Sequence, residues 1–276
     1  MRFEFRVSGF GKAAAKKGVS SFRFRVSAQP IAHNIVPIDP NAKTPKPNRG
    51  YSHQECCGLA VPKPETGNSK RLSPFPMNRL GILLSGRGSN FLAIAHNIAA
   101  RKVPNAEISV VISNKPYTPG IEAAEKLGLN AHVIQSKGLS RAEHDAAIVT
   151  CLREHRVDLV CLAGYMRLIS PTFLESFPNR VLNIHPSLLP AFPGLDAQRQ
   201  ALEYGVQVSG CTVHFVDENL DHGVIILQRS VPVLPDDDEH SLSARILEQE
   251  HIAYSEAIRM VLSGEYEIRG RRYLKK

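Results

Sequence analysis

The chain has 276 residues, of which 43% are hydrophobic, and its 34 Lys and Arg outnumber 26 Asp and Glu, so its formal net charge is +8. A basic chain suggests nucleic acid or a membrane surface as a partner. The charge is unevenly spread, however. Residues 1–76 hold 13 bases and four acids, a balance of +9, whereas residues 77–276 hold 21 bases and 22 acids, a balance of −1. The basic character belongs to the first 76 residues, and for the rest we expect neither nucleic acid nor a membrane as a partner.

The composition also limits the kind of domain that residues 77–276 can form. Their length suits one domain with a hydrophobic core. No stretch reaches the roughly 18 uninterrupted apolar residues that a membrane-spanning helix needs. The five cysteines are spaced too irregularly for a disulfide framework or a zinc site. We therefore expect a reduced, soluble, intracellular domain without a metal.

Residues 1–76 differ from the rest of the chain and form what we call the leader. They hold nine of the 19 prolines and no periodic pattern long enough to bury a face, so we expect them to be disordered. Three interpretations remain open: an organellar transit peptide, a basic arm that contacts nucleic acid, or sequence upstream of a true start at Met77. The first would place the protein in a plastid, and the last favours the cytoplasm.

From residue 80 onward, strands and helices are predicted in alternation. Short apolar runs predict buried strands at residues 80–84, 108–112, 132–135, 157–163 and 181–184. Helical spacing of apolar residues predicts helices at 90–100, 119–127 and 140–155, the last opened by a Ser140 cap. Such alternation indicates a parallel sheet with right-handed crossovers.

The pattern changes after residue 210. Residues 212–216 and 224–233 are predicted to be paired strands, and 241–262 a long helix. The predicted fold is an α/β domain over residues 77–276, with a doubly wound, mostly parallel sheet, a C-terminal β-hairpin and a long helix. Ligands of such sheets bind beyond the carboxyl ends of the strands.

A glycine-containing loop follows the first predicted strand. It reads Ser-Gly-Arg-Gly-Ser-Asn at residues 85–90 and leads into a helix. Free N–H groups at a helix N-terminus favour an anion, most naturally a phosphate. The loop matches neither the dinucleotide fingerprint nor a P-loop, and a simple tight turn is the alternative interpretation.

A second group of polar residues ends the strand predicted at residues 181–184. Asn183 and His185 are two residues apart, so both side chains point to one side of the strand. Asn offers a neutral donor to an oxyanion, and His exchanges a proton near neutral pH. The pair suits a reaction in which a carbonyl oxygen gains charge and a leaving amine is protonated. A capping Asn beside a surface His is the alternative.

An acidic turn at residues 217–223 lies between the two late strands. Such a turn is ordinarily only a hairpin loop. A carboxylate beside His185 would stabilise the imidazolium and fix the orientation of its ring. Asp221 is the candidate for this role.

Four segments occur in an order that resembles the phosphoribosylglycinamide formyltransferases. They are SGRGSN at 85–90, LAGYMRLISP at 162–171, NIHPSLLPAFPG at 183–194 and HFVDENLDHG at 214–223. The resemblance covers residues 77–276. It implies a formyltransferase domain that transfers the formyl group of 10-formyltetrahydrofolate, a co-substrate, to the amine of 5-phosphoribosylglycinamide in purine (IMP) biosynthesis. It implies small-molecule substrates, no metal, and a monomer or homodimer.

The resemblance also implies roles for individual residues. Asn183 and His185 would stabilise the tetrahedral intermediate, with His185 as proton donor, and Asp221 would favour the protonated imidazole and place a water. The residues implied to bind the phosphoribosylglycinamide are Gly88, Ser89, Asn90 and Glu250. Those implied to bind the folate are Arg141, Met166, Arg167, Leu168, Ile169, Asn183, Asp217, Glu218, Asn219, Leu220 and Asp221.

Three alternatives to this activity remain. Formyltetrahydrofolate deformylases share the NIH element but hydrolyse the formyl group, and normally carry an N-terminal regulatory domain. Methionyl-tRNA formyltransferases share the fold and add a C-terminal domain for tRNA. A non-catalytic folate- or nucleotide-binding module would bind without turnover, whereas the Asn, His and Asp set predicts turnover.

Overall fold

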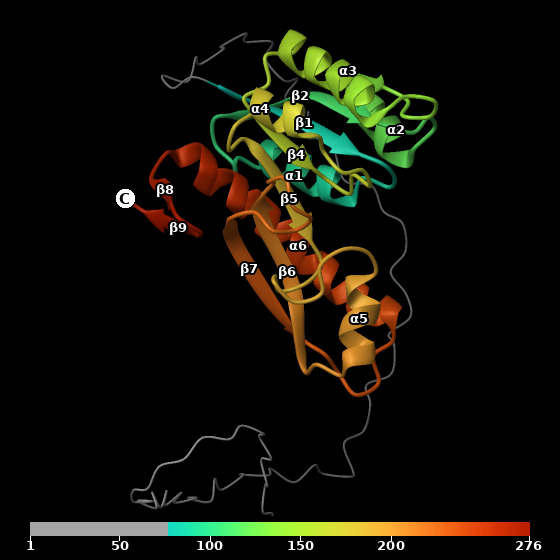
Figure 1. The fold of residues 1–276 in the computed structure, drawn as a ribbon, viewed down its shortest axis with the longest axis vertical. Coiled ribbons are helices and arrows are strands. Elements are labelled where there is room, and N and C mark those ends of the chain that lie inside the picture. The colour runs from blue at the N-terminus through green and yellow to red at the C-terminus, as the bar shows by residue number, and fades with distance from the viewer. Residues whose placement is uncertain (1–76) are drawn as a thin grey trace, which may run out of the picture. The chain divides into compact units, whose positions relative to one another are not determined.

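A nine-stranded sheet with strand order β3-β2-β1-β4-β5-β6-β7-β9-β8 organises residues 77–276, the part of the chain that the computed structural model describes (Figure 1). All predictions about the leader lie outside these residues. The strands are β1 (Asn78–Leu84), β2 (Ala106–Ser113), β3 (Ala131–Val133), β4 (Leu159–Leu162), β5 (Val181–His185), β6 (Val208–Phe215), β7 (Ile225–Pro232), β8 (Tyr266–Arg269) and β9 (Arg272–Lys275). The helices are α1 (Ser89–Ala99), α2 (Pro119–Lys126), α3 (Arg141–Glu154), α4 (Pro171–Ser176), α5 (Ala197–Tyr204) and α6 (Glu239–Ser263).

The first five strands are parallel, as predicted. β1 pairs with β2 on one side and with β4 on the other, and β2 and β4 continue to β3 and β5. The chain thus builds outward in one direction and then returns past β1 to build in the other. The carboxyl ends of β1 and β4 meet at this reversal of strand order, where α/β sheets bind their ligands.

The later strands are antiparallel, which confirms the predicted hairpin. β6 pairs antiparallel with both β5 and β7. β6 begins four residues before the predicted strand, at Val208, because its first residues pair with the end of β7. β8 and β9 extend the sheet beyond β7 as a second short hairpin.

Three short elements were not predicted: α4, α5 and the β8–β9 hairpin. α4 has six residues and depends on its Ser170 cap and Pro171 for its start. α5 begins after Asp196, a left-handed residue without a side-chain cap bond, so it carries no start signal. Strands of four residues such as β8 are too short to show a period.

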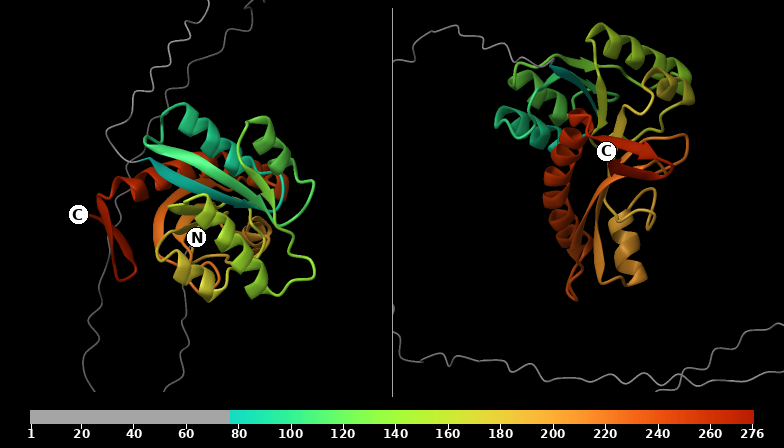
Figure 2. Two further views of the ribbon diagram at one scale, coloured as in Figure 1. Left: turned by 90° about the horizontal axis from the view of Figure 1, so that it is seen from above. Right: turned by 90° about the vertical axis from the view of Figure 1, so that its left-hand side faces the viewer.

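Alternate side chains of the strands enter two hydrophobic clusters, one on each face of the sheet. Ile82 and Leu84 pack with α1, α2 and α6 on one face. Leu83 packs with α3 and α4 on the other. Figure 2 shows helices on both sides of the parallel strands. The Tyr254 hydroxyl, from the middle of α6, lies 3.1 and 3.0 Å from the carbonyls of Leu162 and Leu182, which holds α6 against β4 and β5.

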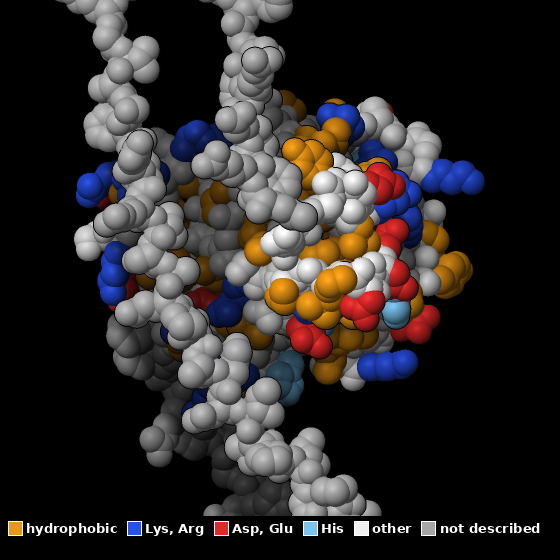
Figure 3. All heavy atoms as spheres, turned by 90° about the horizontal axis from the view of Figure 1, so that it is seen from below, with side chains coloured by type: hydrophobic (Ala, Val, Ile, Leu, Met, Phe, Trp, Pro, Cys, Tyr) orange, Lys and Arg blue, Asp and Glu red, His pale blue; other side chains and the backbone are white. Residues whose placement is uncertain are grey.

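The surface at the α5 end of the domain mixes apolar and acidic side chains. Leu195, Tyr204 and Val208 are exposed there. Figure 3 shows hydrophobic side chains gathered on this face, with acidic side chains beside them. Among the described residues, none of the helices combines the length and apolarity needed to cross a bilayer.

Candidate active site

The loop between β1 and α1 presents backbone donors, as its sequence predicts. Gly88 occupies the N-cap position of α1 with φ of 74°, in the left-handed region that favours glycine. A Cβ there would lie 3.0 Å from the Cα of Gly120, so the close approach of α1 and α2 also requires glycine. The first turn of α1 contains no acidic residue. The N–H groups and dipole of α1 therefore favour an anion, although the formal charge of residues 77–276 is nearly zero.

Asn90 and Glu250 meet beside this loop, although 160 residues separate them. Asn90 Nδ2 donates to Glu250 Oε2 at 2.7 Å. Glu250 lies on α6 and is buried, and burial raises the pKa of its carboxyl, partly offset by the Asn90 bond. Asn90 Oδ1 is buried and has no partner among the described residues. The pair gives the loop a buried donor and acceptor that can bind hydroxyl groups.

The loop after β4 carries the predicted folate segment, and Ser85 connects it to the predicted phosphate loop, residues 85–90. The Ser85 N–H donates to the carbonyl of Gly164 at 3.1 Å, and the Ser85 hydroxyl accepts from the Met166 N–H at 2.9 Å. Met166 and Leu168 are 65% and 51% exposed, whereas Ile169 is buried. The segment thus presents two apolar side chains to solvent beside the phosphate loop, as a surface for an aromatic ring would.

At the end of β5, the antiparallel register brings Asn183 opposite His214 of β6. Asn183 Nδ2 lies 3.3 Å from His214 Nε2, while His214 Nδ1 lies 2.7 Å from the Phe215 carbonyl. Because Nδ1 donates to that carbonyl, Nε2 of the neutral ring accepts from Asn183. Burial lowers the pKa of His214, which keeps the ring neutral. His214 therefore orients the Asn183 amide and leaves its second N–H for a ligand.

His185 ends β5, with its ring between two acceptors. Its Nδ1 lies 3.3 Å from Asp221 Oδ2, and its Nε2 lies 2.8 Å from the carbonyl of Phe192. Both of these partners are hydrogen-bond acceptors, so the ring is held in place at each of its nitrogens. The side chains of His185 and Asp221 are 6% and 8% exposed, so solvent screens their attraction little.

Asp221 is held in place by more than His185. Its Oδ2 accepts from the Gly194 N–H at 2.8 Å, and its Oδ1 lies 3.8 Å from His214 Nε2. Its φ is 48°, an uncommon conformation for a residue with a Cβ. The β6–β7 loop thus returns to β5 and places one carboxylate against both histidines.

The loop after His185 is fastened to β6 and β7. The Thr212 hydroxyl donates to the Ser187 carbonyl at 2.7 Å and accepts from the Leu189 N–H at 3.0 Å. Gln228 Nε2 donates to the Leu189 carbonyl at 2.9 Å. These bonds hold the loop that supplies the Phe192 carbonyl.

The acidic turn itself is more exposed. Asp217 Oδ1 accepts from the Asn219 N–H at 3.0 Å, and Asp217 Oδ2 lies 2.8 Å from His222 Nδ1. Glu218, Asn219 and Leu220 are exposed. At the end of the turn, a Cβ on Gly223 would overlap the Phe215 carbonyl, so the chain can close here only with glycine.

Not all of the predicted residues contact one another. Asn183, His185 and Asp221 form one cluster, and Asn90 and Glu250 form another beside Gly88 and Ser89. Arg167 is half-buried, and its Nε has no partner among the described residues. Arg141 is exposed at the start of α3, one turn before Asp145, whose Oδ2 accepts from the Ser170 N–H at 2.7 Å.

Sequence reasoning missed His214 and Ser85. Both lie in segments that it had quoted, His214 at the start of HFVDENLDHG and Ser85 at the start of SGRGSN. The sequence feature that could have indicated His214 is its position on a strand of the predicted hairpin. Without the register, its partner Asn183 could not be identified.

Comparison with known proteins agrees with this geometry. Residues 78–258 match the formyl transferase family. The chain is 40% identical over 187 residues to the phosphoribosylglycinamide formyltransferase of Bacillus subtilis. The match covers 67% of this chain and 95% of that protein. The chain also resembles glycinamide ribonucleotide transformylase 1 from Symbiobacterium toebii, whose crystal structure superposes with a TM-score of 0.71 at 50% sequence identity. The match covers 72% of this chain and 94% of that chain.

A larger relative contains the same region. The trifunctional purine biosynthetic protein adenosine-3 of Drosophila melanogaster is 48% identical over 189 residues, which make up 67% of this chain. The match spans only 14% of the length of that protein. Because the family match alone extends over more than half of the residues, this chain belongs to the formyl transferase family.

Proposed function

We propose that residues 77–276 transfer the formyl group of 10-formyltetrahydrofolate to the amine of 5-phosphoribosylglycinamide, giving the formylglycinamide ribonucleotide and tetrahydrofolate. The observation that carries this proposal is that the cluster of Asn183, His185 and Asp221 and a helix N-terminus that favours an anion lie at the same carboxyl edge of the parallel strands, with β4 between β1 and β5. The likeness to phosphoribosylglycinamide formyltransferases supports the choice of substrates.

In the first step, the amine lone pair attacks the formyl carbon, and the carbonyl oxygen becomes an oxyanion. The free N–H of Asn183 donates to that oxygen, because its other N–H is engaged by His214. A donor already aimed at the developing charge lowers the barrier without reorganisation.

In the second step, the bond between the formyl carbon and the folate nitrogen breaks, and His185 supplies the proton to that nitrogen. His185 Nε2 donates to the Phe192 carbonyl in this structure, so substrate takes the place of that carbonyl. Asp221 holds the opposite nitrogen and places a water that carries the proton lost by the attacking amine to His185. This transfer restores the imidazolium.

The phosphate of the nucleotide binds the backbone of Gly88, Ser89 and Asn90, and its ribose end meets Glu250. Arg141 and residues 166–169 bind the folate, together with residues 217–220. Both ligands are small molecules, and the donor acts as a co-substrate.

The test mixes the purified full chain with 10-formyltetrahydrofolate, with and without phosphoribosylglycinamide, and follows tetrahydrofolate and the formylated nucleotide. We expect tetrahydrofolate to form only when the amine is present, in equal amount to the product. Formate release at the same rate without the amine would instead identify a deformylase.

The variant Asp221→Asn tests whether the chain is an enzyme or only binds the two substrates. The amide keeps the acceptor for the Gly194 N–H but loses the charge beside His185. We expect both substrates still to bind while turnover falls. Binding with no turnover in the unaltered chain would contradict the proposal and favour a binding module.

A further inference from the structure

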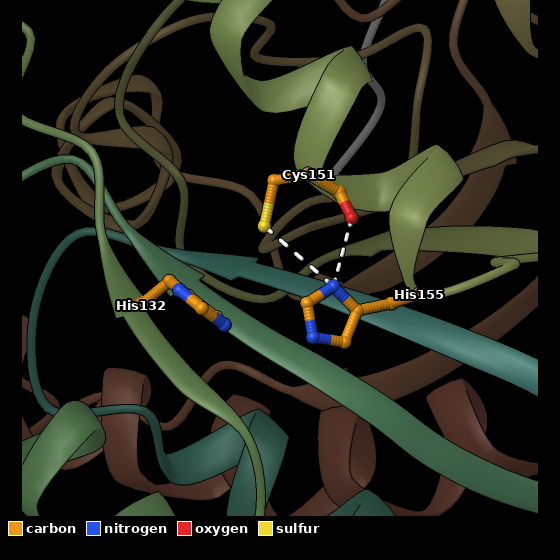
Figure 4. Close-up of side chains that lie close together, drawn as sticks. All are labelled: His132, Cys151 and His155. Atoms are coloured by element: carbon orange, nitrogen blue, oxygen red, sulfur yellow. Dashed lines mark hydrogen bonds between the residues drawn. The ribbon is translucent and has the colours of Figure 1, made fainter.

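A cluster of three metal-ligand side chains lies on elements that the candidate active site does not use. His132 belongs to the edge strand β3, and Cys151 and His155 lie one turn apart at the C-terminal end of α3. One donor atom from each lies within 4.8 Å of the other two. Figure 4 shows the two rings on either side of the space below the thiol. Strands β2, β1 and β4 separate β3 from β5, so the cluster is distinct from His185 and Asp221.

His155 already has the outer contacts that metal-binding histidines show. Its Nδ1 donates to the Cys151 carbonyl at 2.8 Å, which leaves Nε2 with its lone pair on the side facing His132 (Figure 4). Metal-binding histidines almost always donate their second nitrogen to a carbonyl or carboxylate. The Ser109 hydroxyl donates to the His155 carbonyl at 2.7 Å and fixes the end of α3 against β2.

The donors converge on one point but lie somewhat farther apart than the ligands of a bound ion. A tetrahedral zinc ion, at roughly 2.3 Å from sulfur and 2.0 Å from nitrogen, separates two such ligands by about 3.6 Å. The ligand atoms of the three residues lie within 4.8 Å of one another, and the two rings are 5.0 Å apart between centroids. His132 is exposed, so rotation of its side chain can close the remaining gap from the solvent side.

The donor set selects the class of cation. One sulfur and two imidazoles suit zinc and similar borderline cations, and they are poor ligands for Mg²⁺ or Ca²⁺. Cys151 would bind the cation as a thiolate, so binding releases a proton.

We propose that His132, Cys151 and His155 form a site for Zn²⁺ or a similar divalent cation, which joins the edge strand β3 to the end of α3. A water completes the coordination. The role is structural, because β3 has only three residues and a single neighbouring strand. Cysteine spacing in the sequence does not reveal this site, because only the fold brings the two histidines beside Cys151.

The test is titration of the chelator-treated full chain with Co²⁺, whose bond to a thiolate produces a near-ultraviolet absorption band. We expect one equivalent to bind, Zn²⁺ to displace it and Mg²⁺ to leave it in place. Cys151→Ala and His155→Gln should each weaken binding by at least about tenfold. Zn²⁺ should also raise the melting temperature of the unaltered chain but not of Cys151→Ala.

Two controls separate this site from other ligands in the chain. Cys56→Ser with Cys57→Ser removes the adjacent leader thiols, and His240→Gln removes an exposed imidazole elsewhere. Both should keep the absorption band. The proposal is overturned if no band forms, if Cys151→Ala keeps it, or if the leader variant loses it. Circular dichroism of each variant identifies any that fail to fold. If a buried variant fails, His132→Gln changes an exposed residue instead and should likewise weaken Co²⁺ binding.

Discussion

The loop at residues 85–90, proposed to bind phosphate, offers mainly backbone N–H groups and the end of α1. The cluster proposed to transfer the formyl group uses side chains from β5, β6 and the β6–β7 loop instead. The loop is continuous in sequence, and its glycine requirement is local. In the cluster, the antiparallel register joins Asn183 to His214, 31 positions away, and the β6–β7 loop brings Asp221 back to His185. The proposed phosphate contacts therefore need only six consecutive residues. The proposed proton transfer needs side chains that the tertiary structure brings together. Changes in the two regions should accordingly affect different kinetic constants.

The largest effect is expected for His185→Ala. Loss of a general acid typically lowers turnover by about 10²–10⁴-fold. We expect kcat to fall by that factor while the KM for phosphoribosylglycinamide changes little, because the phosphate loop is intact. Steady-state kinetics measures both constants. An unchanged kcat would remove His185 from the mechanism.

Gly88→Ala should affect the opposite region. A Cβ at φ of 74° costs about 1–2 kcal/mol and meets the Gly120 backbone at 3.0 Å. We expect the KM for phosphoribosylglycinamide to rise about tenfold, with a smaller change in kcat. Gly86→Ala is the matched control, because a Cβ there meets nothing within 4 Å. Equal effects of the two variants would contradict the proposed role of the loop geometry.

The pH dependence of the free energy of unfolding should reveal the titration of His214. Burial lowers its pKa in the folded state, so its contribution to stability is present above the unfolded value of about 6.5 and is lost as pH falls through the folded value. Removing this group in His214→Gln should reduce the slope of unfolding free energy against pH by at most about 1.4 kcal/mol per pH unit. Denaturant titrations from pH 7 to pH 5 measure the slope. The same slope in both proteins would mean that His214 does not titrate between these states.

The smallest effect is expected for Glu250→Gln, in stability. Burial raises the pKa of the Glu250 carboxyl, so keeping it charged at neutral pH costs folding free energy. Gln still accepts from Asn90, and we expect the melting temperature to rise by about 2–4 °C while nucleotide binding weakens. The exposed Glu248→Gln, on the same helix, should change neither. A lower melting temperature would show that the charged form stabilises the fold.

Much of the parallel half of the fold was predictable because its signals are local. Buried strands are short apolar runs, and α3 begins at Ser140 with a capping box. The unpredicted α5 lacks such a signal, and β8 gains its place only by pairing with β9. The resemblance predicts that Asn183, His185 and Asp221 share one site. The structure places Asp221 against His185 and His214, and His214 against Asn183, while their catalytic roles stay a prediction.

By itself, the sequence determined the α/β alternation, the glycine loop and the residue types able to move a proton. Only the tertiary structure decided that His214 orients Asn183, that Ser85 ties the phosphate loop to Met166, and that His132 lies beside Cys151 and His155. The physical reason is distance along the chain. Propensities and caps act within a few residues, whereas these contacts depend on strand register and on how helices pack against the sheet.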